Sequence, residues 1–135
     1  MRHLYLASAT LAMIGLGLSL YLTYISNLPY CPLPAPGCDQ VITSPYSRIL
    51  GVPVAALGAT WFALAAALSL MVALGGRGGR ALLSWCVAGM LGVAYLVYVE
   101  IALIGVVCLY CTIAHLLGVG ITGLSTAAIL LQPRG

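Results

Sequence analysis

The chain has 135 residues, of which 63% are hydrophobic and only 5% are charged. This small number of polar side chains cannot cover a water-soluble globule of this size. The composition therefore indicates a membrane protein embedded in the lipid bilayer. The net charge of +3 comes from five scattered arginines that form no basic cluster, which excludes nucleic acid as a partner.

Four apolar runs are each long enough to cross about 30 Å of hydrocarbon at about 1.5 Å per residue. They cover residues 4–25, 54–74, 81–103 and 106–131. Little chain remains outside them, so we expect a single all-α membrane domain over residues 1–135. Its predicted architecture is a four-transmembrane-helix bundle with one sizeable loop at residues 27–53.

The arginines predict the orientation of the bundle. Arg2, Arg77, Arg80 and Arg134 fall on one side of the four predicted spans, and Arg48 alone falls on the other. Because cytoplasmic loops carry the excess of positive charge, we expect cytoplasmic N- and C-termini in a multi-pass protein of the cell membrane. The loop at 27–53 then lies outside the cytoplasm, where disulfides persist.

Four of the five cysteines form two pairs on that outer side. Cys31 and Cys38 flank a proline-rich loop, and Cys108 and Cys111 form a C-x-x-C at the start of the fourth span. The positive end of a helix favours the thiolate, which is the species that attacks disulfides and quinone rings. The loop pair fits a static disulfide or a redox loop that exchanges with a soluble partner, and we favour an electron relay. We expect no metal, because structural zinc stabilises small water-exposed modules.

The segment between the loop pair and the second span carries helix signals. Ser44 suits an N-cap, Pro45 the first helical position, and Gly51 the residue after the last turn. The sequence therefore predicts a short interfacial helix over residues 44–51, on which Ile49 and Leu50 dip into lipid.

Two ionisable residues fall within the apolar runs. His115 lies four residues after Cys111 and shares its helical face, so it is either a donor to a bound quinone or a histidine satisfied by a backbone carbonyl. Glu100 is either a proton relay in a ligand cavity or a side chain that snorkels to water. It also allows an alternative function, a small four-span transporter with Glu100 as its coupling site. Cys86 has no nearby partner and is interpreted as a core residue.

Together these features resemble the vitamin K epoxide reductase family, in particular prokaryotic members without a fused thioredoxin-like domain. The resemblance rests on the Cys31 and Cys38 pair, on C-D-Q-V-I-T-S ending at Ser44, on G-V-P-V-A-A-L-G at the second span, and on C-L-Y-C-T-I-A-H at the fourth. It covers nearly the whole chain.

The resemblance implies a membrane thiol:quinone oxidoreductase that generates disulfides. Electrons would enter from an extracytoplasmic thioredoxin-fold protein at Cys31, pass from Cys38 to Cys108, and leave from Cys111. The acceptor would be a quinone such as menaquinone or ubiquinone.

The resemblance also implies a quinone pocket. Its expected lining is Ser44, Leu57, Trp61, Leu96, Glu100, Ile104, Tyr110 and His115. Spacings of four residues along the second and third spans place several of these side chains on common faces. His115 stands where vertebrate members have a tyrosine, and Val54 where they have an asparagine, so plain quinone reduction is expected rather than reduction of the epoxide.

Overall fold

The structure, a computed structural model, describes residues 2–26, 45 and 48–131. Four helical segments in this part are long and apolar enough to cross a membrane, so the chain is a multi-pass membrane protein. They are α1 (Arg2–Ile25), α3 (Val54–Ala73), α4 (Gly79–Tyr98) with its π-helical continuation η2 (Val99–Ile104), and α5 (Leu109–Leu131). The predicted all-α four-helix bundle is confirmed.

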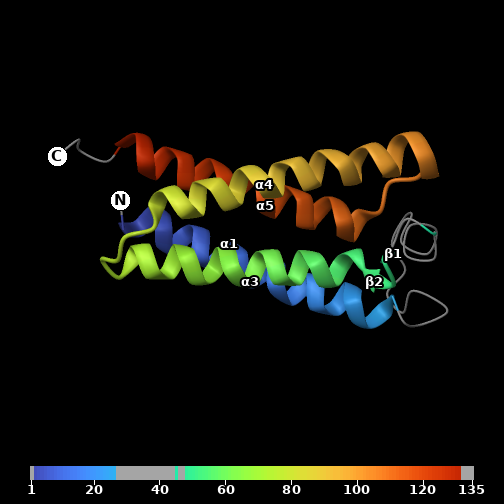
Figure 1. Ribbon diagram of the computed structural model, residues 1–135, viewed down its shortest axis with the longest axis horizontal. Coiled ribbons are helices and arrows are strands. Elements are labelled where there is room, and N and C mark those ends of the chain that lie inside the picture. The colour runs from blue at the N-terminus through green and yellow to red at the C-terminus, as the bar shows by residue number, and fades with distance from the viewer. Residues whose placement is uncertain (1, 27–44, 46–47, 132–135) are drawn as a thin grey trace.

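The helices alternate in direction along the chain. Figure 1 shows that α1 begins and α5 ends at one end of the bundle, whereas the strands β1 and β2 lie at the other. We call this second end the cysteine end, because the connection from η2 to α5 contains Cys108. Helix α1 packs most extensively against α3, and α5 packs against α1 and α4. The outward faces are apolar, with exposed side chains such as Leu91 and Leu116, as a lipid-facing surface requires.

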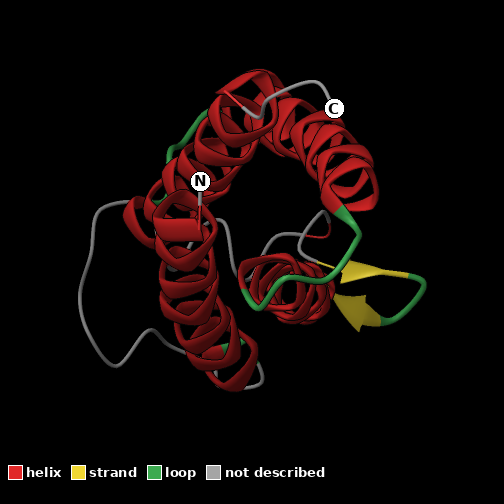
Figure 2. Cartoon of the chain, turned by 90° about the vertical axis from the view of Figure 1, so that its left-hand side faces the viewer, coloured by secondary structure: helices red, strands yellow, loops and turns green. Residues whose placement is uncertain are grey.

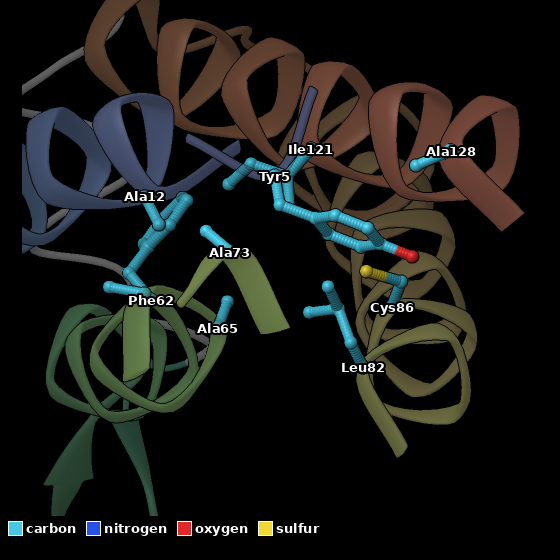
Figure 3. Close-up of a cluster of buried hydrophobic side chains, with 10 residues drawn as sticks. Tyr5, Ala12, Phe62, Ala65, Ala73, Leu82, Cys86, Ile121 and Ala128 are labelled. Atoms are coloured by element: carbon cyan, nitrogen blue, oxygen red, sulfur yellow. The ribbon is translucent and has the colours of Figure 1, made fainter. Parts of the chain in front are cut away.

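A core of small and apolar side chains fills the half of the bundle away from the cysteine end. Tyr5 reaches from α1 toward Leu82 and Cys86 of α4, as Figure 3 shows. Cys86 is fully buried in this cluster, as expected for a core residue. The close approach of α1 and α3 requires a glycine at position 15, because a Cβ there would collide with the ring of Phe62.

Two tryptophans join α3 to α4 by a reciprocal pair of hydrogen bonds. The indole N–H of Trp61 donates to the backbone oxygen of Trp85, and the indole N–H of Trp85 donates to the backbone oxygen of Trp61. Each donor–acceptor distance is 3.0 Å. A buried indole N–H needs such an acceptor where water is absent. The ring of Trp61 lies directly against Gly89 of α4, where a Cβ would overlap it.

The predicted short helix over residues 44–51 is wrong over residues 48–51, whereas Pro45 is in a 3₁₀ turn. Strands β1 (Arg48–Ile49) and β2 (Val52–Pro53) pair antiparallel and form a hairpin that projects sideways from the bundle (Figure 2). Leu50 and Gly51 turn the chain with φ of 53° and 83°, values typical of a tight hairpin turn and incompatible with a helix. The Arg48 guanidinium donates to the backbone oxygens of Gly51 at 3.2 Å and Ser26 at 3.4 Å, which ties the hairpin to the end of α1.

The fourth span also begins later than predicted. Helix α5 starts at Leu109 and not at residue 106, because Gly105 adopts the left-handed conformation with φ of 77° and reverses the chain. Residues 105–108 then run back along η2, so the start of α5 lies inside the end of the bundle (Figure 1). This return segment positions the C-x-x-C.

The contact between Trp61 and Gly89 gives a test of the packing. We expect Gly89→Ala to destabilise the bundle by about 1–3 kcal/mol, because the added methyl displaces the Trp61 ring, whose indole N–H is bonded to the backbone oxygen of Trp85. Gly92→Ala on the same helix is the matched control, since a Cβ there meets nothing within 4 Å. It should be neutral or slightly stabilising. Denaturant unfolding in detergent measures both variants, and equal losses would contradict this account of the contact.

Candidate functional site

A cavity of about 320 Å³ opens at the cysteine end of the bundle. All four helical segments and the hairpin contribute to its wall, and most of the lining side chains are apolar. Its volume lies at the lower end of the range for small-molecule pockets. The few polar groups in the wall include Glu100, Cys111 and His115, which come from η2 and α5.

Aromatic rings close the inner end of the cavity. Trp61 and Phe62 lie edge to face, with ring centroids 5.1 Å apart and planes at 81°. They lie about two turns into α3, which at about 1.5 Å per residue is about 12 Å below Val54. Because Trp61 is fixed by its bond to Trp85 and Phe62 belongs to the core cluster, this floor is rigid.

Cys108 is the residue immediately before α5 and caps that helix with its sulfur. Its backbone oxygen accepts the first helical hydrogen bond, from the N–H of Thr112 at 3.0 Å. Its Sγ accepts the N–H of Cys111 at 3.4 Å, the bond that a serine or aspartate oxygen makes at an N-cap. The side chain is fully buried beside Leu22 and Ile25 of α1.

These contacts stabilise the thiolate of Cys108. The thiol of Cys111 donates to its sulfur, and with the backbone N–H groups of Cys111 and Tyr110 it lowers the pKa of Cys108 to about 7. Burial and the nearby Glu100 carboxylate act in the opposite direction, but the hydrogen bonds outweigh them. A cysteine with this pKa is ionised to a large extent at neutral pH and is therefore nucleophilic.

Glu100 lies in the π-helical turn and connects η2 to the start of α5. Its backbone oxygen accepts two N–H groups, from Gly105 at 2.8 Å and from Val106 at 3.0 Å. Its carboxylate accepts the backbone N–H of Cys108. The side chain is only 5% exposed, so Glu100 is buried in the cavity wall and does not snorkel to water. Turns of π-helix are common at functional sites.

His115 lies one turn beyond Cys111 and lines the same cavity. Its ring makes no hydrogen bond to any residue that the structure describes, so the alternative of a histidine satisfied by a backbone carbonyl is not observed in this part of the chain. An imidazole that faces a cavity in this way can donate to a ligand oxygen.

The structure brings most of the predicted pocket residues together. Those that line the cavity are Leu57, Trp61, Leu96, Glu100, Ile104 and His115. Tyr110 is not among the lining residues; its ring packs edge to face on Tyr21 of α1, with centroids 6.0 Å apart. Cys31, Cys38 and Ser44 lie outside the described residues.

The sequence argument missed several parts of the site. Phe62, Tyr95 and Val99 line the cavity but were not expected there. Phe62 carried a usable signal, because the residue next to Trp61 on an inward-facing helix has to contact a neighbouring helix. Tyr95 and Val99 share a helical face with Leu96 and Glu100, so the same periodicity argument extends to them.

The thiols at this site suit redox chemistry. Within residues 2–26, 45 and 48–131, no group of three or more His, Cys, Asp or Glu side chains is arranged to hold a metal ion. Cys108 and Cys111 are both free thiols, and they lie beside a cavity open to an apolar ligand. A dithiol of this kind can be oxidised to a disulfide by a two-electron acceptor in the cavity.

Four membrane-spanning helices surround a cavity that is lined by Cys111 of the C-x-x-C, an arrangement that fits a membrane redox protein. The comparison with known families agrees: the sequence profile of the vitamin K epoxide reductase family matches residues 6–126 of the chain. The chain belongs to the vitamin K epoxide reductase family, and it is a membrane oxidoreductase of quinone-related chemistry.

The capping bonds of Cys108 predict its titration. In a variant with Cys31, Cys38 and Cys86 replaced by serine, the thiolate signal should rise with pH and reach its midpoint at about pH 7. Replacing Cys111 with alanine as well should move the midpoint upward, toward the ordinary value of about 8.5, because the strongest donor to the sulfur is lost. Ultraviolet absorbance of the thiolate in detergent reports both midpoints. An unchanged midpoint without Cys111 would contradict the assignment of the donor.

Proposed function

We propose that the protein is a thiol:quinone oxidoreductase that generates disulfides. The observation that carries the proposal is the placement of Cys111 in the wall of an apolar cavity, together with His115 and next to Cys108, whose pKa is lowered to about 7. The net reaction is a dithiol plus a quinone to a disulfide plus a quinol. Two electrons and two protons pass to the quinone, so the reaction needs no other oxidant.

The cavity suits a quinone headgroup. Apolar walls bind the ring, and one polar edge, formed by Glu100 and His115, can interact with the ring oxygens. Menaquinone, ubiquinone or a similar quinone fulfils these conditions. Trp61 closes the inner end of the cavity, so the quinone headgroup would stay at the cysteine end of the bundle.

The loop cysteines supply the electrons in this scheme. Cys31 exchanges with an extracytoplasmic thioredoxin-fold protein, and Cys38 then exchanges with Cys108. The burial of Cys108 supports this order, because a fully buried sulfur is out of reach of a separate protein and needs a short segment of the same chain as its partner.

The distribution of arginines supports the proposed sidedness. Arg2 and Arg80 lie at the end of the bundle where the chain begins, and Arg48 lies at the cysteine end. The positive-inside rule then places the termini in the cytoplasm and the cysteines outside it.

Quinone reduction by the purified protein tests the proposed function. With a small dithiol as reductant, the protein in detergent should reduce a soluble quinone, and replacement of Cys31, Cys38, Cys108 and Cys111 by serine should abolish the reaction. Cys86→Ser is the matched control and should leave the rate unchanged, because that buried sulfur lies in the core cluster and does not line the cavity. Activity without the four cysteines would reject the relay. If the protein is instead a transporter with Glu100 as its coupling site, the same replacement should spare transport.

The order of the relay gives a separate prediction. Cys111→Ala should accumulate a disulfide between Cys38 and Cys108, because the thiol that would resolve it is absent. Cys31→Ala should keep quinone reduction by the small dithiol but lose reduction by a thioredoxin-fold protein. Mass spectrometry of the disulfide-linked peptides and the two rate assays check this order, and equal losses with both reductants would contradict it.

His115 is predicted to act on the quinone and not on the loop. Removing a hydrogen bond to a developing oxyanion in a dry site costs about 3 kcal/mol, or about a hundredfold in rate. His115→Leu should therefore slow quinone reduction by about that factor and leave thiol exchange at Cys31 and Cys38 intact. Stopped-flow measurement of the two half-reactions decides the point, and unchanged quinone reduction would make His115 a packing residue.

A further inference from the structure

We propose that Glu100 exchanges a proton with the Cys108 and Cys111 pair during quinone reduction. In this role it takes the proton of the Cys111 thiol as that sulfur attacks the quinone, and it passes the proton to an oxygen of the quinol. The inference rests on the proposed function and assigns the proton acceptor that this chemistry requires.

The position of Glu100 carries the proposal. Its carboxylate accepts the backbone N–H of Cys108, and it lies close enough to the sulfurs of both Cys108 and Cys111 to interact with them electrostatically. Glu100 and Cys111 also line the same cavity, so a ligand between them can touch both. The side chain is almost fully buried. Burying an acidic group inside a membrane span costs free energy, so such residues usually have a function.

Apart from the Cys108 sulfur, to which the Cys111 thiol donates, few groups in the described residues compete for this proton. The titratable residues in the described cavity wall are Tyr95, Glu100, Cys111 and His115, and those described from α1, α3 and the hairpin add none. Arg48, at the base of the hairpin, donates to backbone oxygens of Gly51 and Ser26. The chain has only two acidic side chains, and Glu100 is the one in a membrane span.

The proton and electron count is balanced with one proton on Glu100. The reduced pair begins as the Cys108 thiolate and the Cys111 thiol. Glu100 removes the thiol proton, and the Cys111 sulfur forms a bond to a ring carbon of the quinone. The Cys108 thiolate then attacks the Cys111 sulfur; the sulfur–carbon bond breaks, and its electron pair stays on the ring. One quinol oxygen takes the proton from Glu100, and the other takes a proton from water through His115, which replaces the proton that Cys108 lost to solvent on ionising.

A purely structural role for Glu100 predicts a different outcome for one substitution. Glu100→Gln keeps a side-chain oxygen that can accept the N–H of Cys108, and the backbone bonds to Gly105 and Val106 are unaffected. The amide cannot accept a proton. This variant therefore keeps the hydrogen bond that positions Cys108 and loses only the ability of residue 100 to accept a proton.

Single-turnover reduction of a soluble quinone by the reduced protein is the test, with the exchange of Cys108 and Cys111 with a small disulfide as the control reaction. We expect Glu100→Gln to slow quinone reduction by about a hundredfold or more, the usual contribution of a general base. It should not slow disulfide exchange, because loss of the carboxylate favours the Cys108 thiolate. The residual rate should increase with pH, because hydroxide then replaces the missing acceptor. A rate close to that of the unmodified protein, or an equal loss in both reactions, would overturn the proposal and leave Glu100 with a positioning role.

A second pair of variants covers the case in which Glu100→Gln does not fold. Glu100→Asp and Glu100→Asn have the same shortened stem and differ only in the ability to take a proton. Asp should reduce the quinone at least about tenfold faster than Asn, and equal rates would overturn the proposal. If the unmodified protein does not reduce quinone at all, the proposed function fails first, so the two failures are distinguishable.

Discussion

Three backbone N–H groups between η2 and α5 have to find acceptors in apolar surroundings, and Glu100 accepts all three. Its backbone oxygen binds Gly105 and Val106, and its carboxylate binds Cys108. An unpaired buried amide costs several kcal/mol, so these bonds stabilise the return of the chain into the bundle. Two of them use the backbone oxygen at position 100, and only the bond from Cys108 needs the side chain of Glu100. The burial of the C-x-x-C, the cap on α5 and the polar edge of the cavity all follow from that return.

The cap on α5 connects the redox state of the site to its structure. The Cys108 thiolate is a strong acceptor for the Cys111 N–H, whereas a sulfur in a disulfide is a weak one. Oxidation therefore removes a capping bond at the moment at which the pair has delivered its electrons. The first turn of α5 is held most firmly in the reduced state, in which Cys108 and Cys111 have to be aligned with the cavity.

Hydrophobic runs were sufficient to predict the four helices, because they depend only on local composition and length. Six of the residues that line the cavity were named by the family resemblance, and their spacing along the helices agrees with it. The second span was placed within one residue of α3. The start of α5 was not predictable in this way, since residues 106–108 are as apolar as the helix that follows and the left-handed turn at Gly105 decides the boundary. The prediction of a helix at residues 48–51 failed for a related reason. Ser44, Pro45 and Gly51 match helix signals, but the bond from Arg48 to Ser26 and the turn at Leu50 favour strands.

The reciprocal tryptophan bonds give the molecule a built-in optical reporter. The chain contains only two tryptophans, and both indoles are held at fixed orientations by bonds of equal length. Trp61 forms the floor of the cavity, whereas Trp85 does not line it. An electron-accepting ring that enters the cavity would therefore lie near Trp61 and quench the emission of the protein, which reports occupancy of the cavity without any added label.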